Sequence, residues 1–390
     1  MRSSKPATEK CLDIIREAKN AVYTRTDFTF SLGAYRGTIL VRGGQAMNDR
    51  EWNTLVSVIR GEQLHPLPTA FIIDSPWLPN WAGHTILDYF TSDRIFLDDN
   101  FKAIHTFPQT IFLPGFWSEY GMCTEPSAFG SVSIWGENDF PFAMKVLHAP
   151  EEVDHLATPD PRKHGLLPFV IKRLQHAQPE MEKAGHKIRF AVARGPFNVA
   201  SFLMGTPEFL EALKTEPERM HRLLNLVTDF LVAWIAYQRE QFPTIDGIFL
   251  LDDIVGFVGR RDFESFALPY LQRIYAADVT AKFFHCDAPL KAATPMLESA
   301  GINLLNFGVQ HTLAEMQQWT HHSIALLGNI PPRDVLAEGT PADVERAVRE
   351  LLQPLENRSR LIVSCGGGMP PGAPTANIQA LIATVNEETQ

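Results

Sequence analysis

Short apolar runs in this sequence end repeatedly on a polar or reactive side chain. Segments with the apolar periodicity of amphipathic helices separate these runs. In a parallel βα barrel, the active site gathers where the strands end at their C-termini. The pattern therefore predicts both a fold and the face of that fold that carries the site. The residues that end these runs are Asp74, Asp252, Asp253, His285, Cys286, Asp287, Asn306, Asn329 and Cys365.

Eight apolar runs fit the strands of a (β/α)8 (TIM) barrel. After the third run come two segments, PEFLEALKTEP and ERMHRLLNLVTDFLVAWIAYQREQF, whose apolar residues recur at i, i+3, i+4 and i+7, as in the outer helices of a barrel. Right-handed crossovers make closure of such a sheet the natural outcome. We therefore predict one barrel over residues 47–390. Its strands are predicted at 69–74, 110–114, 188–193, 247–251, 281–285, 303–307, 324–328 and 361–365.

Two segments lie outside this alternation. Residues 1–46 are predicted to form an N-terminal extension with one helix and a short hairpin. Residues 115–162, after the second strand, are rich in aromatic and turn residues, and SVSIW within them is an expected extra strand. This excursion is long for a βα connection. It is expected to form either a lid or wall over the site or a stable surface excursion.

Charge and hydropathy exclude several classes of protein. A net charge of −10 without a basic stripe argues against a nucleic-acid surface. The longest apolar runs are interrupted by charge and too short to span a bilayer, and the N-terminus lacks a signal peptide's apolar core. We therefore expect a cytoplasmic protein with a small-molecule substrate and no membrane partner, and a homodimer is compatible with the sequence. The four cysteines form no CxxC pair, so thiols or metal ligands are expected rather than disulfides.

The tripeptide His285-Cys286-Asp287 is the main candidate for chemistry. In an extended strand, His285 and Asp287 lie on one side and Cys286 on the other. The histidine and the carboxylate could ligate a metal, act as an acid–base pair, or form a hydrogen-bonded cluster that closes the barrel mouth. Tetrahedral zinc needs a third protein ligand, for which Cys365 is the candidate. Because the fifth and eighth strands lie across the barrel from each other, both side chains would have to lean inward.

Other strand ends carry candidate binding groups. Asp252 and Asp253 point to opposite faces, so at most one faces the barrel centre and the other caps a turn or helix. Arg194 suits a substrate carboxylate. Gly366 and Gly367 either let a ligand approach the backbone closely or form a tight turn. The remaining candidates for substrate contacts are Asp74, Asn306, and the aromatic residues Trp77 and Trp117, which could floor a pocket for a large flat ligand.

From about Met47 to the C-terminus, several segments resemble the uroporphyrinogen decarboxylase superfamily. MNDREWNTLVSVIRGE is similar to its opening helix, RGPFNVASFLMGTPEFL to the segment after its third strand, and LLDDIVGFVGRRDFESFALPYLQRIY to its central strand and helix. GNIPPRDVLAEGTPADVERAVRELL and GGGMPPGAPTANIQALI are similar to its last two units. The resemblance implies a (β/α)8 barrel and one of two chemistries.

The first chemistry is porphyrinogen decarboxylation, which in this superfamily uses an arginine-containing RQAGR-type segment to hold the acidic tetrapyrrole. The corresponding stretch here, IDSPWLPNWAG, has no arginine. Gly367 also stands at the position where the family has a histidine in the last glycine turn. The second is corrinoid-dependent methyl transfer, which implies a zinc ion held by a His-x-Cys pair and a distant Cys. Against that pattern His285 matches, Asp287 and Gly367 replace the two cysteines, and Cys365 lies two residues early.

We therefore expect a methyltransferase of this superfamily that moves a methyl group between a corrinoid and a small acceptor or donor. The resemblance implies methylcobalamin or a small corrinoid protein as the methyl partner. In this interpretation His285 and Asp287 bind a metal or the substrate, Asp253 orients them, and Arg194 takes an anionic group. The alternatives are a decarboxylase of a non-porphyrin or tetrapyrrole carboxylate and a non-catalytic protein that binds a corrinoid or tetrapyrrole.

Overall fold

The computed structural model describes residues 47–73 and 76–390 of the chain. The N-terminal extension predicted over residues 1–46 and the predicted binding residue Asp74 lie outside the described residues. No helix in the described part of the chain is long and apolar enough to cross a membrane.

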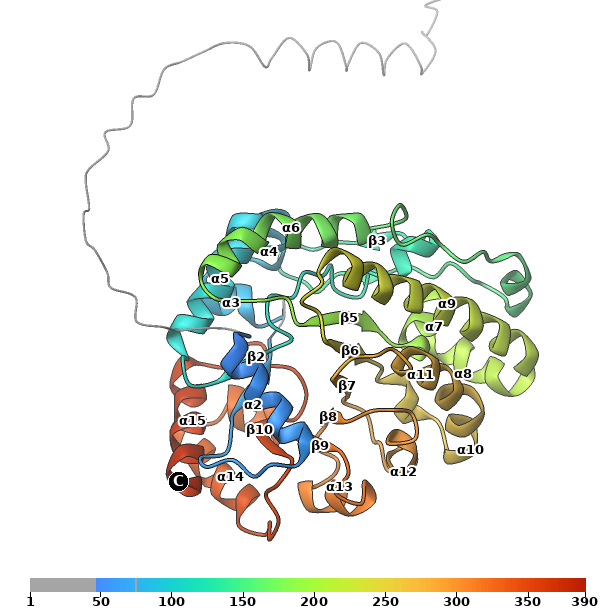
Figure 1. Ribbon diagram of the computed structural model, residues 1–390. Helices are drawn as coiled ribbons and strands as arrows, with labels where there is room; N and C mark the ends of the chain where they lie inside the picture. The colour runs from blue at the N-terminus through green and yellow to red at the C-terminus, as the bar shows by residue number, and fades with distance from the viewer. Residues whose placement is uncertain (1–46, 74–75) are drawn as a thin grey trace, which may run out of the picture. The chain divides into compact units, whose positions relative to one another are not determined.

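The described residues form the predicted (β/α)8 barrel, with helices around parallel strands (Figure 1). Six strands pair in the order β10-β9-β8-β7-β6-β5, and parallel bridges from Thr69 and Ile72 attach the β1–β2 pair beside β10. Each predicted strand overlaps one observed strand. Among the described residues no β-ladder joins β2 to β5. Side chains line the space between these two strands. The strands are β1 (Ala70–Ile72), β2 (Ile111–Leu113), β5 (Phe190–Arg194), β6 (Gly247–Leu251), β7 (Ala281–Cys286), β8 (Leu304–Phe307), β9 (Ala325–Ile330) and β10 (Leu361–Cys365).

Side chains inside the barrel alternate with side chains that face the helices, because a strand has a period of two residues. In β7, for example, Phe283 belongs to the interior cluster and Phe284 to the outer one. Helix α2 (Asp49–Arg60) packs on the interior cluster, and the Trp52 ring meets the Phe190 ring edge-on with their centroids 5.5 Å apart. Phe190 is the first residue of β5, so α2 covers the end of the barrel where the strands begin. The C-terminal ends of the strands are left for the site.

Asn48 caps the N-terminus of α2. Its side-chain oxygen accepts a hydrogen bond from the Glu51 backbone N–H (3.0 Å), and the Glu51 carboxylate accepts one from the Asn48 backbone N–H (3.0 Å). This reciprocal arrangement is a capping box. Burial raises the pKa of Glu51 to about 7, although the hydrogen bond from Asn48 opposes the shift.

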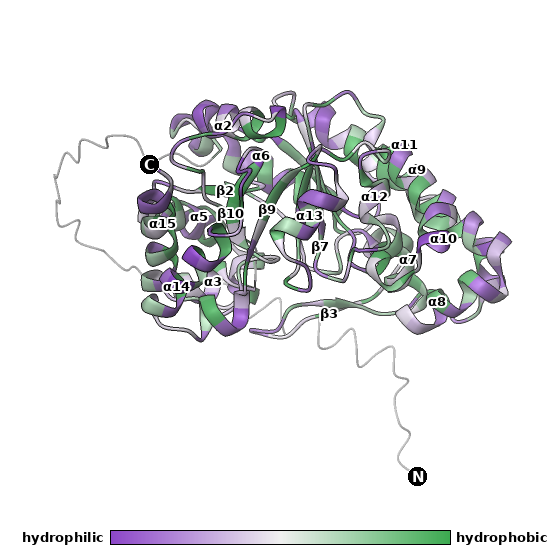
Figure 2. Cartoon of the chain, turned by 90° about the horizontal axis from the view of Figure 1, so that it is seen from below, coloured by the Kyte–Doolittle hydropathy of each residue, from purple (hydrophilic) through white to green (hydrophobic). Residues whose placement is uncertain are grey.

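Hydrophobic residues concentrate on the strands and on the inward sides of the helices (Figure 2). The two helices expected after the third strand are α8 and α9, which confirms the periodicity argument. The helices are α3 (Leu78–Ala82), α4 (Ile86–Thr91), α5 (Asp93–Thr106), α6 (Leu167–Lys183), α7 (Pro196–Met204), α8 (Thr206–Thr215), α9 (Pro217–Gln241), α10 (Arg260–Asp262), α11 (Leu268–Tyr275), α12 (Thr294–Leu297), α13 (Leu313–Trp319), α14 (Pro341–Leu352) and α15 (Thr375–Thr389). Short 3-10 or π turns are η3 (Ile254–Phe257), η4 (Phe263–Ala267) and η5 (Pro332–Ala337).

The excursion after β2 contains η1 (Pro126–Phe129), the antiparallel pair β3 (Ser133–Ile134) and β4 (Phe142–Ala143), and η2 (Pro150–His155). β3 lies in the SVSIW segment, where the extra strand was expected. The first part of the excursion turns into the barrel, because the Trp117 ring packs edge-on against Phe249 with centroids 5.8 Å apart. At least this part is therefore a wall of the barrel mouth rather than a detached surface loop.

Candidate functional site

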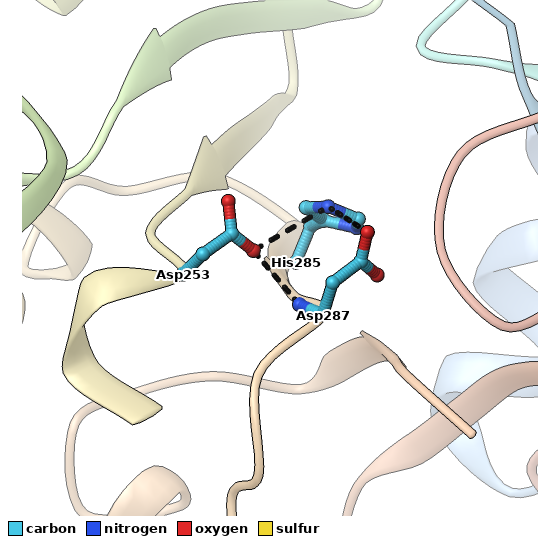
Figure 3. Close-up of side chains that lie close together, drawn as sticks. All are labelled: Asp253, His285 and Asp287. Carbon is cyan, nitrogen blue, oxygen red and sulfur yellow. Dashed lines mark hydrogen bonds and ion pairs between the residues drawn. The ribbon is translucent and has the colours of Figure 1, made fainter. Parts of the chain in front are cut away.

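Three polar side chains meet at the C-terminal ends of β6 and β7 (Figure 3). His285 Nε2 lies 3.8 Å from Asp253 Oδ1 and 3.7 Å from Asp287 Oδ2. The Asp287 backbone N–H also donates a hydrogen bond to Asp253 Oδ1 (2.8 Å), which ties the two strand ends together. In the described part of the chain, these residues form the group of His, Cys, Asp and Glu side chains that could hold a metal ion. We call Asp253, His285 and Asp287 the strand-tip group.

Strand alternation places the members of this group. His285 follows Phe283 at a spacing of two and shares its inward face, whereas Cys286 belongs to the outer cluster. The structure thus confirms that His285 and Cys286 face opposite ways. His285 is buried, while Asp253 and Asp287 expose 38% and 53% of their side chains. The group therefore joins a buried imidazole to two carboxylates that solvent or a ligand can reach.

The setting of Asp287 changes the pKa of its carboxyl group. Burial raises its pKa, the nearby His285 opposes that shift, and the negative charge of Asp253 adds to it. A carboxyl group with a raised pKa exchanges protons more readily near neutral pH than an ordinary aspartate does. Asp287 can therefore serve either as a ligand or as a proton carrier.

Asp252 faces away from the strand-tip group, as the alternation of adjacent carboxylates predicts. Its oxygens accept hydrogen bonds from the backbone N–H groups of Phe197 (3.0 Å) and Asn198 (2.8 Å) at the start of α7. Burial raises its pKa well above the usual range despite these bonds. Asp252 therefore caps α7, which follows the neighbouring strand β5, and the Asn198 side chain in turn holds the start of the Asp253 turn by accepting from the Ile254 N–H (3.1 Å).

The structure does not bring Cys365 into the group. Cys365 belongs to the outer cluster with Val363, and its thiol hydrogen-bonds to the carbonyl oxygens of Gly367 (3.5 Å) and Gly368 (3.6 Å). Cys286 is also buried in the outer layer, and desolvation raises the pKa of its thiol well above the usual value. The thiolate ligand set that the resemblance implies is therefore not assembled. The third member of the group is Asp253 and not the predicted Cys365.

Gly367 lies directly against the Asp287 carboxylate. A Cβ atom built on Gly367 would come within 2.5 Å of Asp287 Oδ1, and the residue has φ +99°, which favours glycine. At this position the resemblance places a histidine in the decarboxylases or a cysteine ligand in the methyltransferases. Here the Asp287 carboxylate occupies the space that a side chain at position 367 would take. Gly367 therefore contributes to the site by leaving this space open. Gly366 instead lies close to Val309, so a Cβ on it would come within 2.8 Å of that side chain.

Arg194 was expected to bind an anionic substrate, and the structure assigns it a different role. Its guanidinium is buried and pairs with Glu119 (2.9 Å) and Glu125 (3.4 Å), and these carboxylates raise its pKa. Glu125 also accepts a hydrogen bond from the Arg194 backbone N–H (3.1 Å). The charge of Arg194 is therefore balanced within the protein. The two glutamates lie in the excursion, and no spacing in the sequence indicated that they would reach β5.

Trp77, Trp117 and Asn306 differ in where they lie. Trp77 is fully buried in the outer cluster, stacks on Trp81 and donates to the Ala373 carbonyl, so it does not line the mouth as expected. Trp117 does enter the interior, against Phe249, whose ring centroid lies 6.4 Å from that of His285. Asn306 contacts His285 and is fully buried.

The strand-tip group fits a divalent cation of hard or borderline character. Ligand atoms about 2.1 Å from a tetrahedral ion are about 3.4 Å from one another. The distances of 3.7 and 3.8 Å from His285 Nε2 to the two carboxylates are within a few tenths of that value. Imidazole suits zinc, iron or cobalt, and carboxylates suit harder ions such as manganese. With no thiolate in the group, the donor set is less selective for zinc than the one the resemblance implies.

Known proteins match the chain over most of its length. A uroporphyrinogen decarboxylase of Actinobacillus succinogenes is 23% identical over 277 residues, 68% of this chain and 76% of that protein. A methylated-thiol–coenzyme M methyltransferase of Methanosarcina mazei is 23% identical over 274 residues, 69% of this chain and 71% of that protein. Among solved structures, a methyltransferase from Methanosarcina mazei superposes with a TM-score of 0.73 at 17% identity, covering 86% of this chain and 98% of that one.

The relatives thus include a uroporphyrinogen decarboxylase and a methyltransferase, at similar levels of identity. The structural similarity supports the barrel fold. The family model for uroporphyrinogen decarboxylase (URO-D) matches residues 82–388. Because this match extends over most of the chain, the protein belongs to the uroporphyrinogen decarboxylase family.

Proposed function

We propose that this protein is a methyltransferase that moves a methyl group between a corrinoid and a small acceptor or donor. The observation that carries the proposal is the strand-tip group, which gathers an imidazole and two carboxylates at the mouth of the barrel. A group of this kind activates a nucleophile by binding a metal or by taking a proton. The lack of arginine in IDSPWLPNWAG and the pairing of Arg194 with two glutamates argue against a polyanionic porphyrin substrate.

The residues of the group take up or return a proton in such a reaction. As the nucleophilic atom of an acceptor X–H takes the methyl group, its proton passes to the carboxylate of Asp287 or Asp253 or to His285 Nε2. The electron pair of the broken carbon–cobalt bond stays with the corrinoid. In the opposite direction the same residues return the proton to the leaving group. A divalent metal held by the three residues would supply a Lewis acid that lowers the pKa of the acceptor.

Exposed apolar side chains near the mouth support a large, partly apolar methyl partner. Phe257, at the end of η3, and Val309, just after β8, expose 62% and 47% of their surface next to the strand ends. Gly367 adds a residue without a side chain next to the Asp287 carboxylate. A corrinoid, free as methylcobalamin or carried by a small protein, would contact these apolar side chains and supply a methyl group bound to a good leaving group.

A second candidate, decarboxylation of a non-porphyrin acid, is favoured by one observation, the raised pKa of Asp287. A carboxyl group with a raised pKa keeps its proton to a higher pH than an ordinary aspartate does, and it can deliver that proton to the carbon from which carbon dioxide leaves. In that reaction the carbon–carbon bond breaks, carbon dioxide departs, and the Asp287 proton forms the new carbon–hydrogen bond.

One assay distinguishes the two candidate reactions. Purified protein loaded with Co2+ or Zn2+ is incubated with methylcobalamin and a panel of thiol, phenol, amine and folate acceptors, while the corrinoid absorbance and carbon dioxide release are followed. The methyltransferase proposal predicts acceptor-dependent loss of the methylcobalamin spectrum that is abolished in His285→Ala. The control is His176→Ala, because this histidine is exposed on α6, where it pairs with Asp93. Loss of the spectrum with no acceptor, or the same rate in His285→Ala, would contradict the proposal. Cobalamin-independent carbon dioxide release from a carboxylate substrate would favour the second candidate.

A further inference from the structure

Asn306 was expected to contact substrate, but its position on β8 indicates another role. We infer that Asn306 is a positioning residue: it holds His285 as the tautomer protonated on Nδ1 and so presents Nε2 to Asp253 and Asp287. This inference deepens the proposed function and relies on it only for what the strand-tip group does.

The orientation of the Asn306 amide is fixed by two backbone carbonyls. Its Nδ2 donates hydrogen bonds to the carbonyl oxygens of Leu327 (2.9 Å) and Cys365 (3.3 Å). Carbonyl oxygens accept only, so the amide nitrogen must face them and the amide oxygen must face the other way. Asn306 Oδ1 therefore points at His285, with its nearest ring nitrogen, Nδ1, 2.8 Å away.

Because Oδ1 is an acceptor, His285 Nδ1 must carry the proton in this contact. In neutral imidazole one nitrogen donates and the other accepts, so the proton on Nδ1 leaves Nε2 with a lone pair. Nε2 is the atom that lies 3.7 to 3.8 Å from the two carboxylates. Asn306 thereby decides which nitrogen of the imidazole takes part in the chemistry.

The barrel makes this contact rigid. His285 and Asn306 are register partners in the parallel pairing of β7 and β8, so their side chains are neighbours on the inward face. Asn306 is fully buried, and its Nδ2 bonds reach both β9 and β10. One amide thus links four consecutive strands at the level of the site, and His285 cannot rotate without breaking this contact.

The tautomer also restricts what the site can bind. The Nε2 lone pair and the carboxylate oxygens of Asp253 and Asp287 all act as hydrogen-bond acceptors when the carboxyl groups are ionised. Three acceptors that converge within 4.8 Å of one another are stabilised by a cation or by a ligand group that donates hydrogen. We therefore expect the substrate atom at this site to be an X–H nucleophile or a metal-bound atom rather than an anionic carboxylate.

Nuclear magnetic resonance of protein labelled with 15N in histidine tests the tautomer without any reaction. The two-bond pattern of ring nitrogens to ring protons identifies which nitrogen is protonated, and the His285 signals are assigned by their loss in His285→Gln. We expect His285 Nδ1 to have the shift of a protonated nitrogen whether the ring is neutral or charged. A neutral ring with its proton on Nε2 in the wild type would overturn the inference even if methyl transfer is found.

A variant pair tests the positioning role. Asn306→Leu removes both the oxygen that accepts from His285 and the nitrogen that donates to the two carbonyls. Asn303→Leu is the matched control, because this amide also bridges β7 and β8, at the opposite end of the strands, by accepting from Lys282 N–H (2.8 Å) and donating to the Thr280 carbonyl (2.9 Å). Loss of a hydrogen-bonding partner behind a metal-binding histidine lowers metal affinity about 10- to 100-fold.

Binding of Co2+ alone, measured by titration calorimetry, should therefore weaken about 10- to 100-fold in Asn306→Leu and change less than about threefold in Asn303→Leu. Asn306→Asp, which keeps an acceptor for Nδ1–H, should retain the wild-type tautomer. Equal Co2+ affinity in wild type and Asn306→Leu, with both folded by circular dichroism, would contradict the positioning role. If Co2+ binds to none of these proteins, the metal part of the proposed function fails, and the tautomer measurement still decides the role of Asn306.

Discussion

Replacing Arg194 with methionine tests whether this residue anchors the barrel or binds substrate. The guanidinium is buried between two carboxylates, those of Glu119 and Glu125, which are themselves buried. Removing one partner of a buried ion pair costs about 3–5 kcal/mol, because the remaining charge has no compensation. Arg194→Met is therefore expected to lower the free energy of unfolding by about 4 kcal/mol.

The assay is thermal and urea unfolding at neutral pH, followed by circular dichroism. For a barrel of this length the unfolding entropy is roughly 0.7 kcal/mol/K, so a loss of about 4 kcal/mol corresponds to a fall in Tm of about 6 °C. The control is the triple variant Arg194→Met, Glu119→Gln, Glu125→Gln, which leaves no buried charge and should recover most of the loss. A change below about 1 kcal/mol in Arg194→Met, or a triple variant as unstable as the single one, would refute the reasoning.

Three further predictions concern single residues. Asp252→Ala should lower the free energy of unfolding by about 1–3 kcal/mol by leaving two buried N–H groups of α7 without an acceptor, and Asp252→Asn by less; equal losses in chemical unfolding would contradict this. Glu51 has a pKa of about 7 when folded against 4.5 in the reference state, so its contribution is complete below about pH 4.5 and is lost as the pH rises through 7, by up to about 3 kcal/mol. Glu51→Gln should flatten this part of the stability–pH curve, and an unchanged slope would show that Glu51 is not its source. Gly367→Ala should cost about 1–2 kcal/mol for its positive φ and weaken Co2+ binding by displacing Asp287, whereas unchanged Co2+ affinity would place Asp287 outside the metal site.

Much of the fold could be predicted from the sequence because each unit of the barrel carries its own signal. The predicted strands at 247–251 and 361–365 coincide with β6 and β10, since each is an apolar run bounded by turn residues. Alternation along β7 placed His285 inward and Cys286 outward. These are local properties of the chain, and a period of two residues determines them wherever a strand is extended.

The same alternation, applied to β10, puts Cys365 on the side of Leu361 and Val363, toward the helices. Its place at the end of the eighth strand makes Cys365 the candidate third ligand, but the structure follows the alternation and turns its side chain away from the group. The alternation rule is the better guide here, because the side on which a strand residue lies depends on its own neighbours rather than on a relative's ligand set.

The partners of Arg194 and Asn306 could not be predicted, because they depend on distant parts of the chain. Glu119 and Glu125 reach Arg194 through the excursion after β2, whose path has no periodic signal. Asn306 could be placed on the inward face of β8. Its role, however, depends on register with His285 and on carbonyls of two further strands, which only the assembled sheet provides.

The central claim is that Asp253, His285 and Asp287 form one metal-binding centre at the mouth of the barrel. The most direct test is an anomalous difference map from crystals grown with Co2+. We predict one Co2+ per chain, bound by His285 Nε2 and by an oxygen of each aspartate, and lost in His285→Ala. A map with no peak at this position, or with the Co2+ bound to the sulfur of Cys365 instead, would contradict the account.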